Sequence, residues 1–190
     1  MSLRVRFAAA ARPMPGEREC GDQWAGETRG DETTLILADG LGHGPEAAAV
    51  ARRVVAIALE RLALPVAEIL ATCHAELRGS RGAAVTIVRC FAREGRLSHC
   101  GVGNVEVTGI TRVPVRPIST PGIVGVRARK FVETTYLLHP GDLLLLYTDG
   151  VSSRLSLERF RALEPSAMVD AILAQHAKEH DDAACIVVRC

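Results

Sequence analysis

Apolar positions fall into two kinds of pattern along the chain, and each kind predicts one kind of element. Short aliphatic and β-branched runs are typical of buried strands, and longer stretches of Ala, Leu, Arg and Glu at helical spacing are typical of amphipathic helices. We predict strands within 1–12, 33–38, 83–88, 97–102, 106–111, 132–138, 142–147 and 184–188, and helices over 47–62, 65–77 and 166–178.

Glycine and proline mark the breaks between these elements. Residues 13–21 form a polar, Pro/Gly-rich stretch, Pro45 suits the first turn of a helix, and residues 93–96 read as a hairpin turn. The connection over 111–130 is rich in Pro and Gly and has a basic end; it is interpreted equally well as a mobile flap near a site or as an ordinary surface loop. Runs of strands separated by helical blocks favour an α+β fold with antiparallel sheets over a doubly wound parallel sheet.

Composition narrows the class of protein. With 190 residues, the chain is expected to form a single domain, 1–190, and 48% hydrophobic and 24% charged residues are typical of a folded globular protein. A formal net charge of +1 leaves no cationic excess for nucleic acid, and no apolar run reaches the roughly 18 residues that cross a membrane. Six cysteines without C-x-x-C spacing are expected to stay reduced in the cytoplasm.

An apolar strand runs directly into Asp-Gly at two places. These are Asp39-Gly40 and Asp149-Gly150. Either pair alone is about as consistent with a hairpin turn. The first, however, leads into a Gly-rich loop and a helix, and the second into a polar segment rather than a returning strand. The repeated pattern therefore predicts a carboxylate at the end of each strand.

Further acidic residues fit the same arrangement. Asp22 lies in a predicted turn before the first buried strand, and Asp181-Asp182 come directly before the last. Carboxylates gathered at one sheet edge would repel one another unless a cation lies between them. Oxygen ligands of this kind select Mg²⁺ or Mn²⁺, and two such ions can hold a bridging water and neutralise charge on a phosphoryl group. The expected chemistry is phosphoester hydrolysis.

These residues resemble the metal-dependent protein phosphatases of type 2C, and specifically their bacterial branch typified by the stage II sporulation phosphatase. The resemblance runs the whole length of the chain and is closest to short stand-alone phosphatases of stressosome and partner-switching systems. It rests on an ordered set of short motifs: Gly21-Asp22, Ala38-Asp39-Gly40-Leu41-Gly42-His43-Gly44, Gly101-Val102-Gly103-Asn104, Tyr147-Thr148-Asp149-Gly150-Val151, and Asp181-Asp182 before Ile186-Val187-Val188.

The resemblance implies a four-layer α-β-β-α sandwich, with two antiparallel sheets flanked by helices, and two Mn²⁺ or Mg²⁺ ions at one end. It implies that Asp39 bridges both ions and that Gly40 lends its carbonyl oxygen. Asp149 and Asp181 would bind one ion and Asp22 the other, with the choice between Asp181 and Asp182 left open.

One departure concerns the general acid. Leu41 stands where eukaryotic members have a His directly after the first Asp-Gly, and His43 follows two positions later. His43 is a candidate to protonate the leaving serine oxygen or orient a water, and the alternative is a role in shaping the loop. Eukaryotic members also have an arginine that binds the phosphate group. This chain has no clear counterpart of it, and Arg12 and Arg18 are candidates only by their position in the sequence.

The resemblance implies a phosphoserine/phosphothreonine protein phosphatase that attacks with metal-bound hydroxide. Its expected partner is a phosphorylated regulatory protein, of the anti-sigma antagonist or stressosome scaffold type. Two alternatives remain: a non-catalytic phosphoprotein-binding regulator with the same fold, and, more weakly, a metal-dependent phosphodiesterase. A non-catalytic regulator could bind its phosphorylated partner without taking up manganese. A phosphodiesterase would cleave model diesters but not model monoesters.

Overall fold

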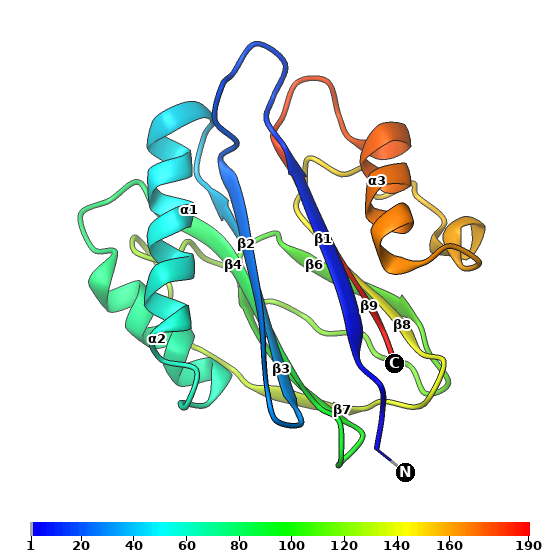
Figure 1. Cartoon of the computed structure of the whole chain (residues 1–190). Coiled ribbons are helices and arrows are strands. Elements are labelled where there is room, and N and C mark those ends of the chain that lie inside the picture. The colour runs from blue at the N-terminus through cyan, green and yellow to red at the C-terminus, as the bar shows by residue number, and fades with distance from the viewer. Residues whose placement is uncertain (1) are drawn as a thin grey trace.

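The fold is built on two antiparallel sheets. A computed structural model describes residues 2–190 (Figure 1). One sheet has the order β1-β9-β8-β6 and the other β2-β3-β4-β5-β7. The strands are β1 (Arg6–Arg12), β2 (Asp22–Arg29), β3 (Glu32–Gly40), β4 (Ala83–Phe91), β5 (Arg96–Val102), β6 (Glu106–Ile110), β7 (Thr134–Leu137), β8 (Leu143–Tyr147) and β9 (Ala183–Arg189).

Helices cover the outer face of each sheet, which gives four layers (Figure 1). The helices α1 (Gly44–Leu59) and α2 (Val66–Glu76) pack on the five-stranded sheet, and α3 (Pro165–His176) with the short η1 (Leu157–Phe160) packs on the four-stranded sheet. One apolar core lies under the helices on each sheet. A further apolar core lies between the two sheets, where side chains such as Leu37, Val88 and Ile186 meet. The predicted α-β-β-α sandwich is thus confirmed.

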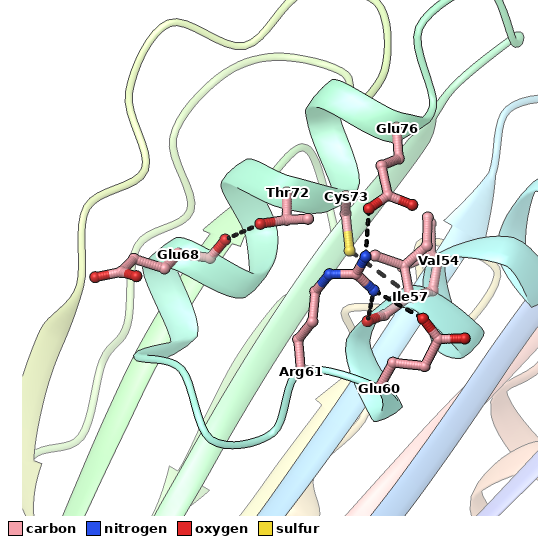
Figure 2. Close-up of polar contacts among 8 residues, drawn as sticks. All are labelled: Val54, Ile57, Glu60, Arg61, Glu68, Thr72, Cys73 and Glu76. Atoms are coloured by element: carbon pink, nitrogen blue, oxygen red, sulfur yellow. Dashed lines mark hydrogen bonds and ion pairs between the residues drawn. The ribbon is translucent and has the colours of Figure 1, made fainter.

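Polar contacts at the ends of the helices tie α1 to α2 (Figure 2). The guanidinium of Arg61 donates to the Ile57 carbonyl oxygen at 3.1 Å and to carboxylates of Glu60 and Glu76 at 3.0 and 2.5 Å. The Cys73 thiol lies 3.8 Å from the Val54 carbonyl oxygen. These contacts fix the helix pair as one layer on the sheet.

Two elements are absent from the predictions. No element was predicted over residues 23–32 and Asp22 was expected in a turn, but Asp22 is the first residue of strand β2. The strand escaped notice because it is half-buried at the sheet edge and lacks clear alternation. It contains Gly26, where a Cβ would overlap the ring of Phe7. The short η1 was also not predicted, whereas the other helices and strands match their predicted ranges to within a few residues.

The connection between β6 and β7 is held against the five-stranded sheet by backbone contacts. Val124 and Ala83 exchange two hydrogen bonds of 2.9 and 3.1 Å, and Thr120 pairs with Val102. This anchoring brings Gly122 and Ile123 to the pocket described below, so the connection lies beside the candidate site. Within residues 2–190, no helix is long and apolar enough to cross a membrane.

Candidate active site

A pocket of about 270 Å³ lies where the ends of both sheets meet, and acidic residues dominate its polar lining. Among residues 2–190, no Lys or Arg lines it. The lining residues are Asp39, Leu41, Gly42, His43, Ala84, Asn104, Gly122, Ile123, Asp149 and Asp181. A cavity of this composition is suited to a cation.

The five-stranded sheet supplies Asp39 to the pocket, and it places Asp22 beside Asp39, buried and outside the pocket lining. Both are positioned by strand register, because Asp22 opens β2 directly opposite Asp39 near the end of β3. Gly40 follows, with a backbone N–H that donates to the Gly21 carbonyl at 3.1 Å. A Cβ at Gly40 would overlap the carbonyl oxygen of Ala47, so close packing against α1 is itself a reason for glycine there.

The four-stranded sheet supplies Asp149 and Asp181. Strands β8 and β9 are antiparallel neighbours, so the turn after β8 lies beside the turn before β9. The Thr148 N–H donates to the Ala184 carbonyl at 3.1 Å, and the Gly150 carbonyl accepts from the Lys178 N–H at 2.8 Å. Residues 110 positions or more away from Asp39 in sequence thus reach the same pocket.

Two neighbouring side chains orient these carboxylates. The hydroxyl of Thr148 donates to Asp22 Oδ2 at 2.7 Å, which links the two sheets. Asn104 Nδ2 donates to Asp149 Oδ2, also at 2.7 Å. Neither residue was predicted to have a role, although both lie in the motifs that carry the family resemblance. Their positions in the sequence could have indicated these roles: Thr148 directly precedes Asp149-Gly150, and Asn104 ends a Gly-rich turn.

Asp181 and Asp182 have different surroundings. Asp181 lines the pocket, whereas Asp182 does not. Asp182 Oδ1 accepts a 2.8 Å hydrogen bond from the Met14 N–H, which ties the loop before β2 to the turn before β9, side by side at the upper end of the molecule (Figure 1). Its buried Oδ2 has no hydrogen-bond partner among the described residues 2–190.

Burial and mutual repulsion raise the pKa values of three carboxyl groups. The pKa of Asp22 is raised first by burial and then by the charge of Asp39. Burial, followed by the charges of Asp149 and Asp181, raises the pKa of Asp39, and burial and Asp149 raise that of Asp181. Because the pKa values of Asp22 and Asp39 are raised to about 8 and about 7, these two groups resist ionisation near neutral pH without a bound cation.

His43 lines the pocket at the start of α1. Its Nδ1 lies 2.8 Å from Glu17 Oε1. This contact was not predicted, because Glu17 lies in an irregular polar loop. Of the two candidate phosphate-gripping arginines, Arg12 donates to the Lys178 carbonyl at 2.5 Å. Arg18 is exposed, and neither arginine lines the pocket.

Comparison with known proteins identifies the family. The family model described as "Stage II sporulation protein E (SpoIIE)" matches residues 29–190. The chain belongs to the SpoIIE family. It is also 25% identical over 142 residues to "Phosphoserine phosphatase RsbX" of Bacillus subtilis (strain 168), which covers 72% of this chain and 70% of that protein.

Solved structures agree on the fold. One, from work on "The bacterial stressosome: a modular system that has been adapted to control secondary messenger signaling", has a TM-score of 0.94 and 30% identity, covering 98% of this chain and all of that one. Another, RsbX in complex with magnesium, has a TM-score of 0.86 and 20% identity, covering 97% of this chain and 94% of that one. The predicted family and enzyme class, a protein serine/threonine phosphatase, are confirmed.

Membership in this family implies dependence on a divalent metal. The donor set fits such an ion, because the pocket gathers carboxylate oxygens whose repulsion a hard cation would relieve. Across residues 2–190, no three His, Cys, Asp or Glu side chains form a ready-made cage for one ion.

Proposed function

We propose that this chain, with residues 1–190 as one domain, removes phosphate from serine or threonine of a phosphorylated regulatory protein. The substrate would belong to a bacterial partner-switching or stressosome pathway, as an anti-sigma antagonist or a stressosome scaffold. Similarity to RsbX and to the stressosome-associated structure supports this pathway. The six free thiols support a location in the reducing cytoplasm.

The observation that carries the proposal is the group of carboxylates from both sheets around one pocket. We assign two Mn²⁺ or Mg²⁺ ions to Asp22, Asp39, Asp149 and Asp181, with the Gly40 carbonyl as a further oxygen. When bound, such ions activate water and neutralise charge on the phosphoryl group. Asp182 is retained as a neighbour that anchors the loop before β2, since its Oδ1 already accepts from the Met14 N–H.

The chain's own residues would orient the site and move a proton. Thr148 and Asn104 hold one oxygen each of Asp22 and Asp149, which leaves the other oxygen of each carboxylate available. His43 has its Nδ1 engaged by Glu17, so Nε2 is the atom that would donate a proton to the leaving serine oxygen.

The direct test is phosphate release from p-nitrophenyl phosphate and from a phosphoserine protein, with and without Mn²⁺. We expect manganese-dependent hydrolysis of both. Hydrolysis of a model diester but not of these monoesters would favour the phosphodiesterase. Binding of a phosphorylated partner without manganese uptake or turnover would favour the non-catalytic regulator, which the intact set of acidic residues disfavours.

A further inference from the structure

A second cavity, of about 650 Å³, lies next to the acidic pocket and has the opposite charge. It is formed by the connection between β6 and β7. Its floor is apolar, with Pro121 and Ile123, and its charged residues are Arg127, Arg129 and Lys130. We name this cavity, lined by residues 120–123, 127, 129 and 130, the cationic groove.

The three cations of the groove are available for a ligand. Arg127, Arg129 and Lys130 are all exposed. Among residues 2–190, no carboxylate lies within ion-pairing distance of any of them, although eleven ion pairs occur elsewhere in that part of the chain. Positive charge without internal partners attracts anions from outside.

The cationic groove and the acidic pocket share a wall. Gly122 and Ile123 line both cavities. The backbone of Arg127 is fixed to this wall by reciprocal hydrogen bonds of 2.8 Å with Ile123. A Cβ at Gly122 would overlap the Arg127 carbonyl oxygen, so the close approach requires glycine. The groove therefore has a defined place relative to the pocket.

This continuity indicates what the groove binds. A phosphorylated side chain that enters the pocket carries its polypeptide across the adjoining surface, at about 3.3 Å per extended residue. We propose that the cationic groove binds an acidic segment next to the phosphorylated serine or threonine of the substrate protein. This inference rests on the proposed function and adds that the substrate segment next to the phosphorylated residue is acidic.

The charge pattern explains why such a groove helps. An acidic phosphopeptide is repelled by a pocket of carboxylates, even when bound ions offset part of their charge. Cations beside the pocket supply a compensating attraction for the phosphopeptide. They also favour one direction of the bound peptide across the surface. Nucleic acid, the other common polyanion, fits less well because the whole chain has a net charge of only +1.

The experiment compares two phosphoserine peptides, one with Asp and Glu beside the phosphoserine and one with Asn and Gln there. Exposed ion pairs contribute little singly, so we expect the three cations together to favour the acidic peptide about tenfold in kcat/KM. In the triple variant Arg127→Glu, Arg129→Glu, Lys130→Glu, this ratio should fall to one or below. High salt should lower the ratio of the unaltered protein in the same way.

A matched control changes the net charge equally at a distance from the groove. Arg4, Arg53 and Arg159 are exposed, belong to none of the ion pairs above and line neither the groove nor the pocket. The variant Arg4→Glu, Arg53→Glu, Arg159→Glu should therefore keep the tenfold ratio. Loss of the ratio in this control as well would show a general charge effect and overturn the inference.

The outcomes separate this inference from the proposed function. If p-nitrophenyl phosphate and both peptides are hydrolysed with equal kcat/KM for the peptides, the groove assignment is wrong and the function stands. If nothing is hydrolysed, the function is wrong, and fluorescence anisotropy with a labelled acidic peptide decides the groove. Weaker binding of the acidic peptide to the groove variant than to the unaltered protein supports the groove assignment. Equal binding of the peptide to both proteins contradicts it, and so does a labelled oligonucleotide that binds the unaltered protein more tightly than the peptide does.

Discussion

The two Asp-Gly pairs share a sequence pattern but differ in environment. Asp39 lies within β3, paired in register with Asp22, and is half-buried. Asp149 lies in the turn after β8, is exposed, and accepts a hydrogen bond from Asn104. The same pattern thus delivers one carboxyl group whose pKa is raised by burial and neighbouring charges, and another that faces water and accepts a hydrogen bond from an amide.

Their glycines differ as well. Gly40 is required by the carbonyl oxygen of Ala47 in α1, and Gly150 by the carbonyl oxygen of Asp182 in the turn before β9. Neither has the positive φ of Gly42 or Gly44. The lesson is that Asp-Gly here marks the close approach of two backbone segments, and each approach carries an acidic residue to the pocket.

The largest effect should come from removing each charge in turn. Asp39→Asn and Asp149→Asn should each lower kcat/KM for p-nitrophenyl phosphate at least about 100-fold, as expected for loss of a charge that organises the reaction. The two variants should differ in stability, measured as the free energy of unfolding of the metal-free protein in urea. Asp39→Asn should raise this free energy by about 1 to 3 kcal/mol, because it removes a half-buried, repelled charge. Asp149→Asn should change it by less than about 0.5 kcal/mol.

Asp170→Asn is the control for this pair, because Asp170 is exposed on α3 and does not line the pocket. It should leave both turnover and stability near those of the unaltered protein. Full activity in Asp39→Asn or Asp149→Asn would remove that residue from the proposed site. Equal stability changes in the two would show that burial does not distinguish them.

The glycines should give the next largest effect, on stability. Gly40→Ala and Gly150→Ala each force a methyl group against backbone, which cannot move as a flexible side chain can. We expect a loss of about 3 kcal/mol in the free energy of unfolding, measured in urea. Gly141→Ala is the comparison, since it has φ +89 but no heavy atom within 4 Å of the added Cβ. Only the conformational cost of about 1 to 2 kcal/mol applies there.

If Gly141→Ala proved as costly as the other two, close packing would not be the reason for glycine at positions 40 and 150. A larger cost at Gly40 than at Gly150 would show that α1 is the less adaptable neighbour. Either result can be read from denaturation midpoints at unchanged m-value.

The smallest expected effect is a pH dependence of the metal-free protein. Asp22, Asp39 and Asp181 have pKa values raised in the folded state, so the folded protein holds more protons than the unfolded chain as pH rises through this range. The contribution of these three groups to stability is therefore greatest near pH 4 and is lost as pH rises toward about 8. Urea unfolding in a chelator at pH 5 and pH 8 should show a loss of about 2 kcal/mol.

Asp39→Asn should reduce this pH dependence, and Asp149→Asn should reduce it less. Saturating Mn²⁺ should abolish or reverse it, because binding to the folded state favours the ionised carboxylates. A metal-free protein that becomes more stable between pH 5 and pH 8 would contradict the assigned repulsion.

Much of the fold could be predicted because local patterns and tertiary structure agree. The aliphatic runs of β3, β8 and β9 are buried on both faces and read as strands without ambiguity. Strand β2 could not be predicted, because an edge strand with Gly26 and an exposed Trp24 lacks the alternation that identifies strands. Its only signal was Asp22, which the resemblance placed in the site, whereas the Gly21-Asp22 pattern predicted a turn there.

The candidate site was predictable where it follows strand ends, and less so where it depends on long-range contacts. Asp39 and Asp149 are visible as carboxylates after apolar runs. The contact between Glu17 and His43 joins residues 26 positions apart through an irregular loop, and no periodicity reports it. Likewise, the choice between Asp181 and Asp182 depends on the Met14 N–H, which only the folded chain brings within reach.

The most direct test of the central claim is calorimetric titration of Mn²⁺ into the metal-free protein at about pH 7.5, in buffers of different ionisation enthalpy. The account predicts saturable uptake of two ions, release of protons from the raised carboxyl groups, and much weaker uptake by Asp39→Asn. No uptake, or uptake that Asp39→Asn leaves unchanged, would contradict it.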